Sequence, residues 1–220
     1  MGLHHSPRIV TNGLLFCWDP GNTKSYPGSG TTITDLSGNG RHATLLNGTT
    51  ISNGTMGCTT RNHCARLQAQ DYSAYSNITV DMWYKRNGVN DTGTGGAGLP
   101  TYYQGVFNYY WEHYIYVGLG NDATSTNLTI FTVSTTLALN TWVHIVGITG
   151  SGGAAGYING NLIGTNAGQA LTTSRDVYIG NYDTSWASFC NIGPTKVYNR
   201  ALTAAEIKQS FNSTRGRYGI

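Results

Sequence analysis

The stretch Thr141–Thr165, TWVHIVGITGSGGAAGYINGNLIGT, decides the expected fold because it holds two hairpin signals in succession. Its first part, Trp142–Thr149, has a period of two with apolar side chains on both faces, which predicts a central strand of a sandwich. Asn159-Gly160 then separates the short segments Ala155–Ile158 and Asn161–Gly164, and this pair tolerates the positive φ values of a type I′ turn. The stretch therefore predicts three antiparallel strands in a row.

The composition extends this prediction to the whole chain. With 220 residues and 23.7 kDa, the chain is long enough for one sizeable core and short for two. Gly accounts for 30 residues and Tyr for 15, whereas charged residues make up only 10%, which is typical of many short strands joined by polar turns. We expect one β-sandwich at 14–198, preceded by an arm at 1–13 and followed by a helix and tail at 199–220.

Charge and hydropathy exclude two classes of partner. The net charge of +3 comes from 13 basic residues scattered singly, without the Lys/Arg cluster that tracks phosphates, so no nucleic acid is expected. No apolar run approaches the roughly 18 residues of a membrane span, and residues 1–13 lack the apolar region of a secretory signal. We expect no membrane partner and synthesis in a cytoplasm, which would keep four cysteines as thiols: Cys17, Cys58, Cys64 and Cys190.

The C-terminal region carries the signals of a helix. Thr203 and Glu206 form a T-x-x-E capping box, and Leu202 and Ile207 occupy the positions of a hydrophobic staple. The sequence therefore predicts one short α-helix near residues 203–214 that docks on the sandwich.

The N-terminal segment Met1–Asn12 has no periodicity and few sizeable apolar side chains. These are too few to offset the roughly 1–2 kcal/mol per residue of backbone entropy that ordering costs. We expect another protein chain to hold this arm, for example by strand addition at an exposed sheet edge. Pro194 indicates such an edge, because proline within a strand marks an edge or a bulge. The alternative is that the arm docks along its own first strand, Leu14–Asp19.

A loop at residues 22–40, NTKSYPGSGTTITDLSGNG, consists almost entirely of turn-forming residues. Asp35 and Asn39 could supply oxygen ligands to calcium, which is bound by loops of this kind. The alternative is that these side chains cap their own turns and hold no metal. Calcium at this loop is the one candidate cofactor.

The segment 101–118, TYYQGVFNYYWEHYIYVG, is dense in aromatic residues, and NYDTSW at 181–186 is a second polar aromatic stretch. Aromatic side chains stack on sugar rings and form rigid interface anchors, so we expect a ligand or partner here. The alternative is that the tyrosines pack a strand, because Tyr has an apolar body and a polar tip. The candidate binding residues are Tyr109, Tyr110, Trp111, His113, Tyr182, Asp183 and Trp186.

The sequence lacks the pair of carboxylates that glycoside hydrolysis requires. Glu206 belongs to the helix cap, and Glu112, the other Glu of the chain, has no acidic neighbour within several residues. No nucleophile elbow, zinc-binding helix or phosphate loop is present in the sequence either. We therefore expect a protein that is not an enzyme.

Five stretches carry a family resemblance: HSPRIVTNGLLFCWDPGNTKSYPGSGTTITDLSGNGRHATL at 5–45, ITVDMWYKR at 78–86, TWVHIVGI at 141–148, YINGNLIG at 157–164 and VYNRALTAAEIKQSFNSTRGRYGI at 197–220. Together they resemble the laminin G-like branch of the concanavalin A-like lectin/glucanase superfamily, in the version found in bacterial and phage structural proteins. The resemblance implies an all-β, antiparallel jelly-roll β-sandwich with adjacent first and last strands, and sugar or protein binding more often than catalysis. The family's acidic F-D-G-x-D-D-Y segment is replaced here by CARLQAQDYSAY at 64–75, which removes ligands that the implied calcium would use.

Two functions are consistent with these features. The first is a virion structural protein, a phage capsid decoration or tail-associated protein that packs on neighbouring capsid or tail subunits as a homo-oligomer within the assembly. The alternative is a carbohydrate-binding adhesin that recognises host surface glycans. The expected location is the virion, after synthesis in the host cytoplasm.

Overall fold

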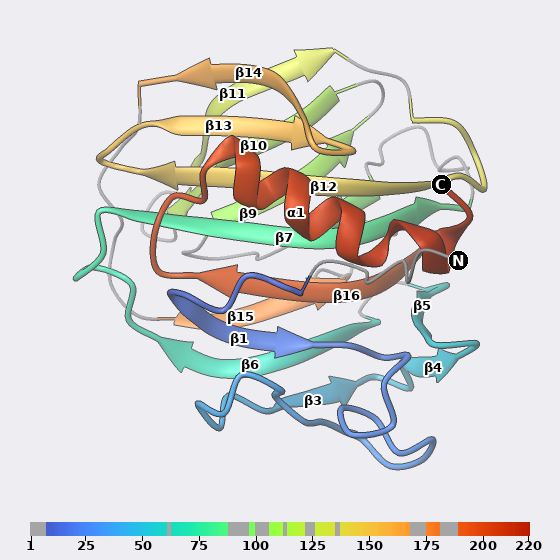
Figure 1. Cartoon of the computed structure of the whole chain (residues 1–220). Helices are drawn as coiled ribbons and strands as arrows, with labels where there is room; N and C mark the ends of the chain where they lie inside the picture. Colours follow the sequence, from blue (N-terminus) through green and yellow to red (C-terminus); the bar gives the residue numbers. More distant parts are fainter. Residues whose placement is uncertain are drawn as a thin grey trace, which may run out of the picture.

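The computed structural model describes residues 8–60, 63–87, 97–99, 106–111, 114–121, 126–134, 137–167, 175–180 and 189–220. For residues 69–70, for the strands between 97 and 134, and for 175, 176 and 178, the description covers the backbone only. Within this part of the chain, antiparallel strands form a two-layered sandwich with one α-helix on its outer surface (Figure 1). The predicted all-β sandwich with a single short C-terminal helix is confirmed.

The first layer, within the described residues, is an eight-stranded antiparallel sheet. Its strands, in spatial order, are β14 (Asn161–Asn166), β13 (Ala154–Ile158), β12 (Trp142–Gly150), β7 (Asn77–Arg86), β16 (Cys190–Tyr198), β5 (Thr55–Cys58) and β4 (Thr50–Ser52), with β1 (Leu14–Trp18) also paired to β16. The first and last strands of the chain are therefore adjacent, as the family resemblance implied.

Two four-stranded antiparallel sheets form the second layer of the described chain. One has the order β11 (Thr126–Ser134), β10 (Tyr114–Asn121), β9 (Val106–Trp111) and β8 (Ala97–Leu99). The other has the order β15 (Arg175–Gly180), β6 (Cys64–Gln70), β3 (Ala43–Leu46) and β2 (Thr32–Ile33). Within the glycine-dense stretch 89–100, residues 97–99 form β8 and pair with β9.

Strands β12, β13 and β14 form the predicted meander. Asn159 and Gly160 have φ values of 51° and 76°, and Ile158 pairs directly with Asn161 across the turn. This is the type I′ geometry that Asn-Gly favours. β12 lies between β13 and β7, so the prediction of a central strand is also confirmed.

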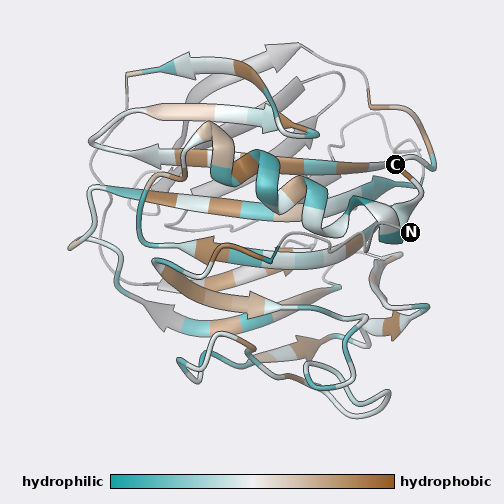
Figure 2. Ribbon diagram, in the orientation of Figure 1, coloured by the Kyte–Doolittle hydropathy of each residue, from teal (hydrophilic) through white to brown (hydrophobic). Residues whose placement is uncertain are grey.

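Alternation along β7 directs its side chains to the two faces of the sheet. Ile78, Val80, Met82 and Tyr84 point into the core between the layers, whereas Asp81 lies on the opposite face beneath the helix. Figure 2 shows brown and teal segments alternating along these central strands, because one face packs in the core and the other carries polar residues such as Asp81 beneath the helix.

A bulge in β16 changes which of its residues face the core. The pairing of β16 with β7 shifts register between Ile192 and Thr195, so Ile192 before the bulge and Val197 after it both join the core. The bulge accommodates Pro194, which has no N–H for the ladder. The predicted bulge is confirmed, but the predicted edge is wrong, because β16 pairs with β7 on one side and with β1 and β5 on the other.

The helix α1 (Ala204–Thr214) begins at the predicted capping box. Thr203 Oγ1 accepts a hydrogen bond from the Glu206 backbone N–H at 3.2 Å, and the Glu206 carboxylate accepts one from the Thr203 N–H at 2.9 Å. The helix lies across β12, β7 and β16 (Figure 1) and buries Ile207 and Phe211 against them. Neither α1 nor any other helix of the described residues has the length and hydropathy to span a membrane.

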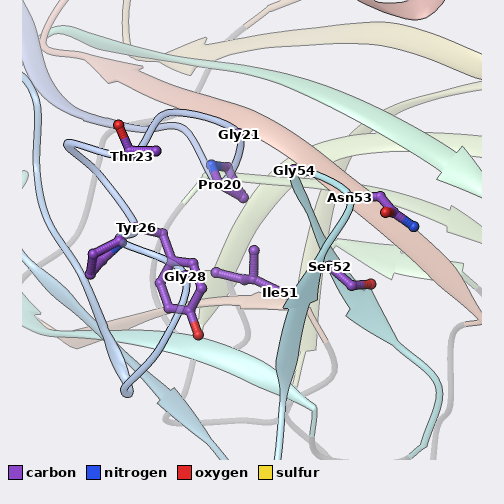
Figure 3. Close-up of a pocket in the computed structure, with 10 residues that line it drawn as sticks. Pro20, Gly21, Thr23, Tyr26, Gly28, Ile51, Ser52, Asn53 and Gly54 are labelled. Carbon is purple, nitrogen blue, oxygen red and sulfur yellow. The ribbon is translucent and has the colours of Figure 1, made fainter.

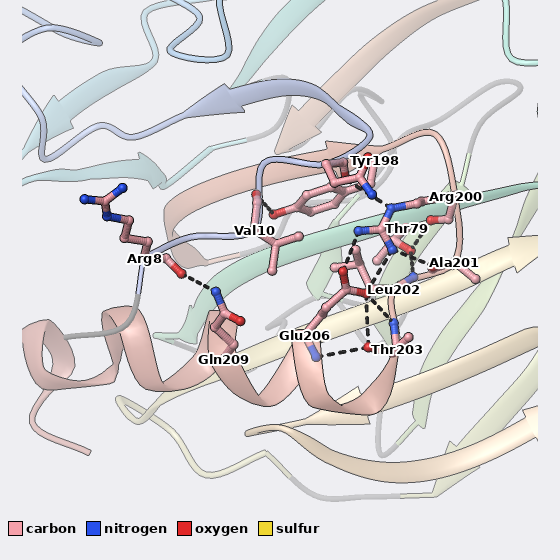
Figure 4. Close-up of polar contacts among 11 residues, drawn as sticks. Arg8, Val10, Thr79, Tyr198, Arg200, Ala201, Leu202, Thr203, Glu206 and Gln209 are labelled. Carbon is pink, nitrogen blue, oxygen red and sulfur yellow. Dashed lines mark hydrogen bonds and ion pairs between the residues drawn. The ribbon is translucent and has the colours of Figure 1, made fainter. Parts of the chain in front are cut away.

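The N-terminal arm contacts its own domain. The Tyr198 hydroxyl donates to the Val10 carbonyl at 3.1 Å, Arg200 Nε donates to the Asn12 carbonyl at 3.1 Å, and Val10 is buried beside the helix (Figure 4). The expectation that another chain holds the arm is therefore wrong for residues 8–12. Side-chain donors of the sandwich supply the hydrogen bonds that the arm cannot make alone; residues 1–7 lie outside the described residues.

Candidate functional site

The structure describes only a small part of the aromatic site that the sequence predicts. Tyr109, Tyr110 and Trp111 belong to β9, whose backbone pairs with β8 and β10. Their side chains, and the whole of His113, Tyr182, Asp183 and Trp186, lie outside the described residues. This binding site therefore stays a prediction.

A pocket of about 220 Å³ lies at one end of the sandwich, between the loop after β1 and the β4–β5 hairpin (Figure 3). The loop supplies one wall and the hairpin supplies the other. The lining residues are Pro20, Gly21, Thr23, Tyr26, Pro27, Gly28, Ile51, Ser52, Asn53 and Gly54.

Hydrogen bonds within the loop fix the first wall. Asp19 Oδ1 accepts a hydrogen bond from the Gly21 N–H at 3.0 Å, and the Asp19 carbonyl accepts one from the Asn22 N–H at 2.9 Å. The buried Ser25 hydroxyl accepts from the Asp19 N–H at 3.1 Å and donates to the Thr34 carbonyl at 2.7 Å. The loop is therefore held in one conformation although most of its residues are exposed.

The second wall depends on a tight hairpin turn. Asn53 and Gly54 have φ values of 51° and 70°, and Ser52 pairs with Thr55 across them. A Cβ on Gly54 would lie 3.0 Å from the Cα of Gly21, so glycine at this position lets the two walls meet. The Asn53-Gly54 pair is a hairpin signal that was readable from the sequence, but its contact with a loop 33 positions earlier was not.

The pocket combines an apolar floor with an uncharged polar rim. Figure 3 shows the side chains of Pro20, Tyr26 and Ile51 around the pocket, and the Tyr26 hydroxyl donates to the Gly30 carbonyl at 3.2 Å. Ser52 and Asn53 are exposed at the edge, and none of the ten lining residues is charged. This surface suits a neutral ligand with both C–H faces and hydroxyl groups.

The C-terminal turn η1 (Arg215–Tyr218) braces the loop that forms the first wall. Arg217 Nη1 lies 2.7 Å from Asp19 Oδ1, the same oxygen that caps Gly21. The adjacent Tyr218 ring stacks on Trp83 with centroids 4.3 Å apart. The hydrogen bond to Asp19 raises the pKa of Arg217, so the guanidinium stays charged and the loop stays tied to the domain.

Asp35 and Asn39, the candidate calcium ligands, fasten the 22–40 loop to β1. Asp35 Oδ1 accepts from the Cys17 N–H at 2.9 Å, and Oδ2 accepts from the Ser37 hydroxyl at 2.7 Å and the Arg41 N–H at 3.1 Å. Burial alone would raise the pKa of Asp35, but these hydrogen bonds outweigh it and lower the pKa.

The side-chain amide of Asn39 also holds the 22–40 loop against β1. Asn39 Nδ2 donates to the Leu14 and Leu15 carbonyls at 2.9 and 3.0 Å. Within the turn itself, Asp35 Oδ1 also accepts from the Ser37 N–H at 2.9 Å, as the turn-capping alternative expects, and the described residues contain no cluster of three acidic, His or Cys side chains able to hold a metal.

A cluster of charged residues lies buried between the sheet and α1. Asp81 Oδ1 is 2.9 Å from Lys196 Nζ and 3.1 Å from His144 Nε2, and Asp81 Oδ2 accepts from the Ser210 hydroxyl of α1 at 2.5 Å. Burial would raise the pKa of Asp81, but Lys196, His144 and Ser210 together hold it well below its usual value. All four side chains are enclosed, so this cluster fixes the helix and has no opening for a ligand.

Residues 59–208 match the model of the concanavalin A-like lectin/glucanases superfamily. This match covers more than half of the chain, so the chain belongs to that superfamily. No curated protein matches the sequence.

Solved structures with the same fold include enzymes and toxin domains. A sialidase from Trypanosoma rangeli aligns with a TM-score of 0.69 and 15% identity over 92% of this chain and 33% of its own. The botulinum neurotoxin serotype D ligand binding domain, in complex with N-acetylneuraminic acid, aligns with a TM-score of 0.71 and 12% identity over 92% of this chain and 51% of its own. The binding domain of Paraclostridial mosquitocidal protein 1 aligns with a TM-score of 0.67 and 20% identity over 92% of this chain and 52% of its own.

The comparison corrects one expectation from the sequence. The prediction that the protein is not an enzyme is overturned by sialidases among the structures that share its fold. That prediction rested on the lack of a carboxylate pair and of a few catalytic motifs in the sequence. Such a lack argues only against the particular mechanisms that use them. The chain spans about a third of the sialidase chain, so the likeness is one of fold.

Proposed function

We propose that this chain is a carbohydrate-binding module and that its sugar occupies the pocket between the loop Pro20–Gly28 and the hairpin Ile51–Gly54. The observation that carries the proposal is the uncharged pocket, in which an aromatic and apolar floor meets a rim of hydroxyl and amide groups. Sugars present the same combination, because their C–H faces pack on aromatic rings and their hydroxyls exchange hydrogen bonds.

The size and rigidity of the pocket support the same ligand class. Its volume of about 220 Å³ is below the roughly 300–1,000 Å³ of sites for drug-sized ligands, which favours a single sugar ring. The walls are fixed before binding by Asp19, Ser25 and the Asn53-Gly54 turn, so little ordering entropy is lost when a ligand enters. Membership of a superfamily named for its lectins, and a fold shared with toxin binding domains, also support the proposal.

A glycan array followed by calorimetric titration tests this function. The wild-type domain should bind at least one saccharide, and Tyr26→Ala should weaken that binding at least tenfold because the ring of the floor is lost. Leu162→Ala on β14 is the matched control, since Leu162 is exposed and belongs to another edge of the sandwich. Equal affinity for the wild type and Tyr26→Ala would place the sugar elsewhere.

The predicted aromatic residues define a second place where a sugar could bind. If the ligand sits there, Trp111→Ala and Trp186→Ala will abolish binding while Tyr26→Ala leaves it unchanged. The two sets of variants therefore separate the pocket from the predicted aromatic site.

A virion structural role, with residence in a phage particle, is the second candidate function. The resemblance to phage-type proteins is carried by the two ends of the chain, and Ile9 and Ile220 near those ends are exposed apolar residues that a neighbouring subunit could cover. Imaging of labelled copies of this chain on purified particles tests the role, and absence of the chain from particles would exclude it.

A further inference from the structure

Cys58 and Cys190 lie directly opposite each other on neighbouring antiparallel strands. Cys190 is the first residue of β16, and the register pairs it with Cys58, the last residue of β5. Both thiols are free and fully buried. Two facing thiols can be oxidised to a disulfide, a reaction that has no part in the fold or the pocket described above.

The pairing geometry matches the requirements of a disulfide. Directly opposed residues of an antiparallel pair have Cα atoms about 4.5 or 5.5 Å apart, and disulfides span Cα separations of about 4.4–6.8 Å. The side chain of Cys58 raises the pKa of Cys190 well above its usual value, as expected for two thiols that face each other across paired strands.

The other two thiols have different positions. Cys17 lies on β1 opposite Lys196. Cys64 lies near Cys58 but on β6 of the second layer, where its register partners are Leu46 and Gly180. The cross-strand arrangement therefore distinguishes Cys58–Cys190 from the alternative pair Cys58–Cys64.

We propose that Cys58 and Cys190 form a cross-strand disulfide when the chain folds in the presence of a low-molecular-weight disulfide such as oxidised glutathione. The thiolate of one cysteine attacks the glutathione disulfide, forms a mixed disulfide and releases one glutathione thiolate. The second cysteine thiolate then attacks the protein sulfur of the mixed disulfide and displaces the other glutathione. Two protein thiols lose two protons and two electrons in total, and one oxidised glutathione becomes two reduced molecules.

The timing of the reaction follows from the surroundings of the pair. The neighbouring Cys58 side chain, together with burial, raises the pKa of Cys190 well above its usual value, so the folded protein holds almost no thiolate at Cys190. The disulfide consequently forms during folding, before the core closes, and the folded reduced protein resists the same oxidant.

The disulfide would strengthen the attachment of β5 to β16, which depends on few residue pairs. β5 pairs with β16 through three residue pairs, and it carries the hairpin that forms one wall of the pocket. The disulfide would restrict the denatured chain between residues 58 and 190, which raises stability most for long loops. This inference concerns the redox chemistry of the core and holds whether or not the pocket binds a sugar.

Refolding in glutathione buffers followed by peptide mapping tests the proposal. Protein refolded with an excess of oxidised glutathione should retain two alkylatable thiols, whereas protein refolded in reduced glutathione should retain four. Trypsin separates the four cysteines into four peptides, so the predicted bond links peptide 42–61 to peptide 176–196 and leaves peptides 9–24 and 62–66 alkylated. The oxidised protein should also unfold at a higher urea concentration than the reduced protein.

Single substitutions provide the control. Cys64→Ala should preserve the link between peptides 42–61 and 176–196 and the difference in urea midpoint, whereas Cys190→Ala should abolish both. Four alkylated thiols after oxidative refolding of the wild type, or a link that includes peptide 62–66, would overturn the proposal. The wild-type peptide map gives this answer even if a variant does not fold.

Discussion

Replacing Asp81 with Asn should destabilise the domain strongly, because Asp81 is the buried counter-ion of Lys196. Asp81 lies 2.9 Å from Lys196 Nζ, and its side chain and that of Lys196 are 0% and 1% exposed. The substitution leaves the Lys196 ammonium buried without its counter-ion and weakens the hydrogen bond from Ser210 of α1. Removal of one partner from a buried ion pair costs about 3–5 kcal/mol. That is a large part of the roughly 5–15 kcal/mol of a typical domain and corresponds to a fall in Tm of roughly 6–20 °C.

Urea denaturation followed by tryptophan fluorescence measures this loss, because Trp83 lies on the strand that carries Asp81. Asp71→Asn is the matched control, since Asp71 is exposed and its loss should change the free energy of unfolding by less than about 0.5 kcal/mol. The double variant Asp81→Asn/Lys196→Met should recover much of the loss, because no unpaired buried charge remains. A fall of less than about 1 kcal/mol for Asp81→Asn, or strict additivity in the double variant, would show that the buried pair of Asp81 and Lys196 does not stabilise the domain.

The same residue gives the stability a pH dependence with a defined sign. The folded-state pKa of Asp81 is depressed, so its contribution is present above its unfolded pKa of about 3.9 and is lost as the pH falls below that value. Acid titration of the wild type should show a steep loss of stability below about pH 4. Asp81→Asn should be less stable at neutral pH and should show a smaller loss on acidification.

Three further predictions concern local contacts. Gly54→Ala should weaken sugar binding and lower the free energy of unfolding by about 1–3 kcal/mol, since φ is +70° and the new Cβ would approach Gly21. Gly48→Ala is the control, because Gly48 has a similar φ of +78°, a Cβ there meets no atom within 4 Å, and the residue lies outside the pocket. Equal binding by both variants would contradict the role of the Gly21–Gly54 contact. Thr203→Ala should cost about 1 kcal/mol by chemical denaturation because it removes the capping box of α1, and an unchanged urea midpoint would show that the helix is held by packing alone. Deletion of residues 1–12 should lower the melting temperature of the isolated domain, because Val10 and Asn12 dock on Tyr198 and Arg200; an unchanged melting temperature would show that the arm serves a partner instead.

Local signals in the sequence predicted the elements whose geometry is local. Asn159-Gly160 fixed a hairpin because the positive φ values of its turn are an intrinsic preference of these two residues. Thr203 and Glu206 predicted the start of α1 because the capping box involves only four consecutive residues.

Features that depend on contacts between distant segments could not be predicted in this way. No local pattern places Asp81, Lys196 and Ser210 together, because their contact requires the register of β7 with β16 and the docking of α1. The arm was assigned to a foreign partner because the donors that hold it, such as Tyr198, come from the other end of the chain. The pocket likewise exists only because Gly21 and Gly54 meet in the folded domain.

Chemical-shift mapping with a saccharide identified on a glycan array locates the sugar relative to the pocket between the loop after β1 and the β4–β5 hairpin. A sugar in this pocket should cause saturable shifts of the backbone amides of Gly21, Gly28 and Gly54, with the amides of β14 unchanged, and these shifts should be lost in Tyr26→Ala. Saturable binding that leaves these three amides unchanged, or the absence of binding to any saccharide, would contradict the proposed sugar site.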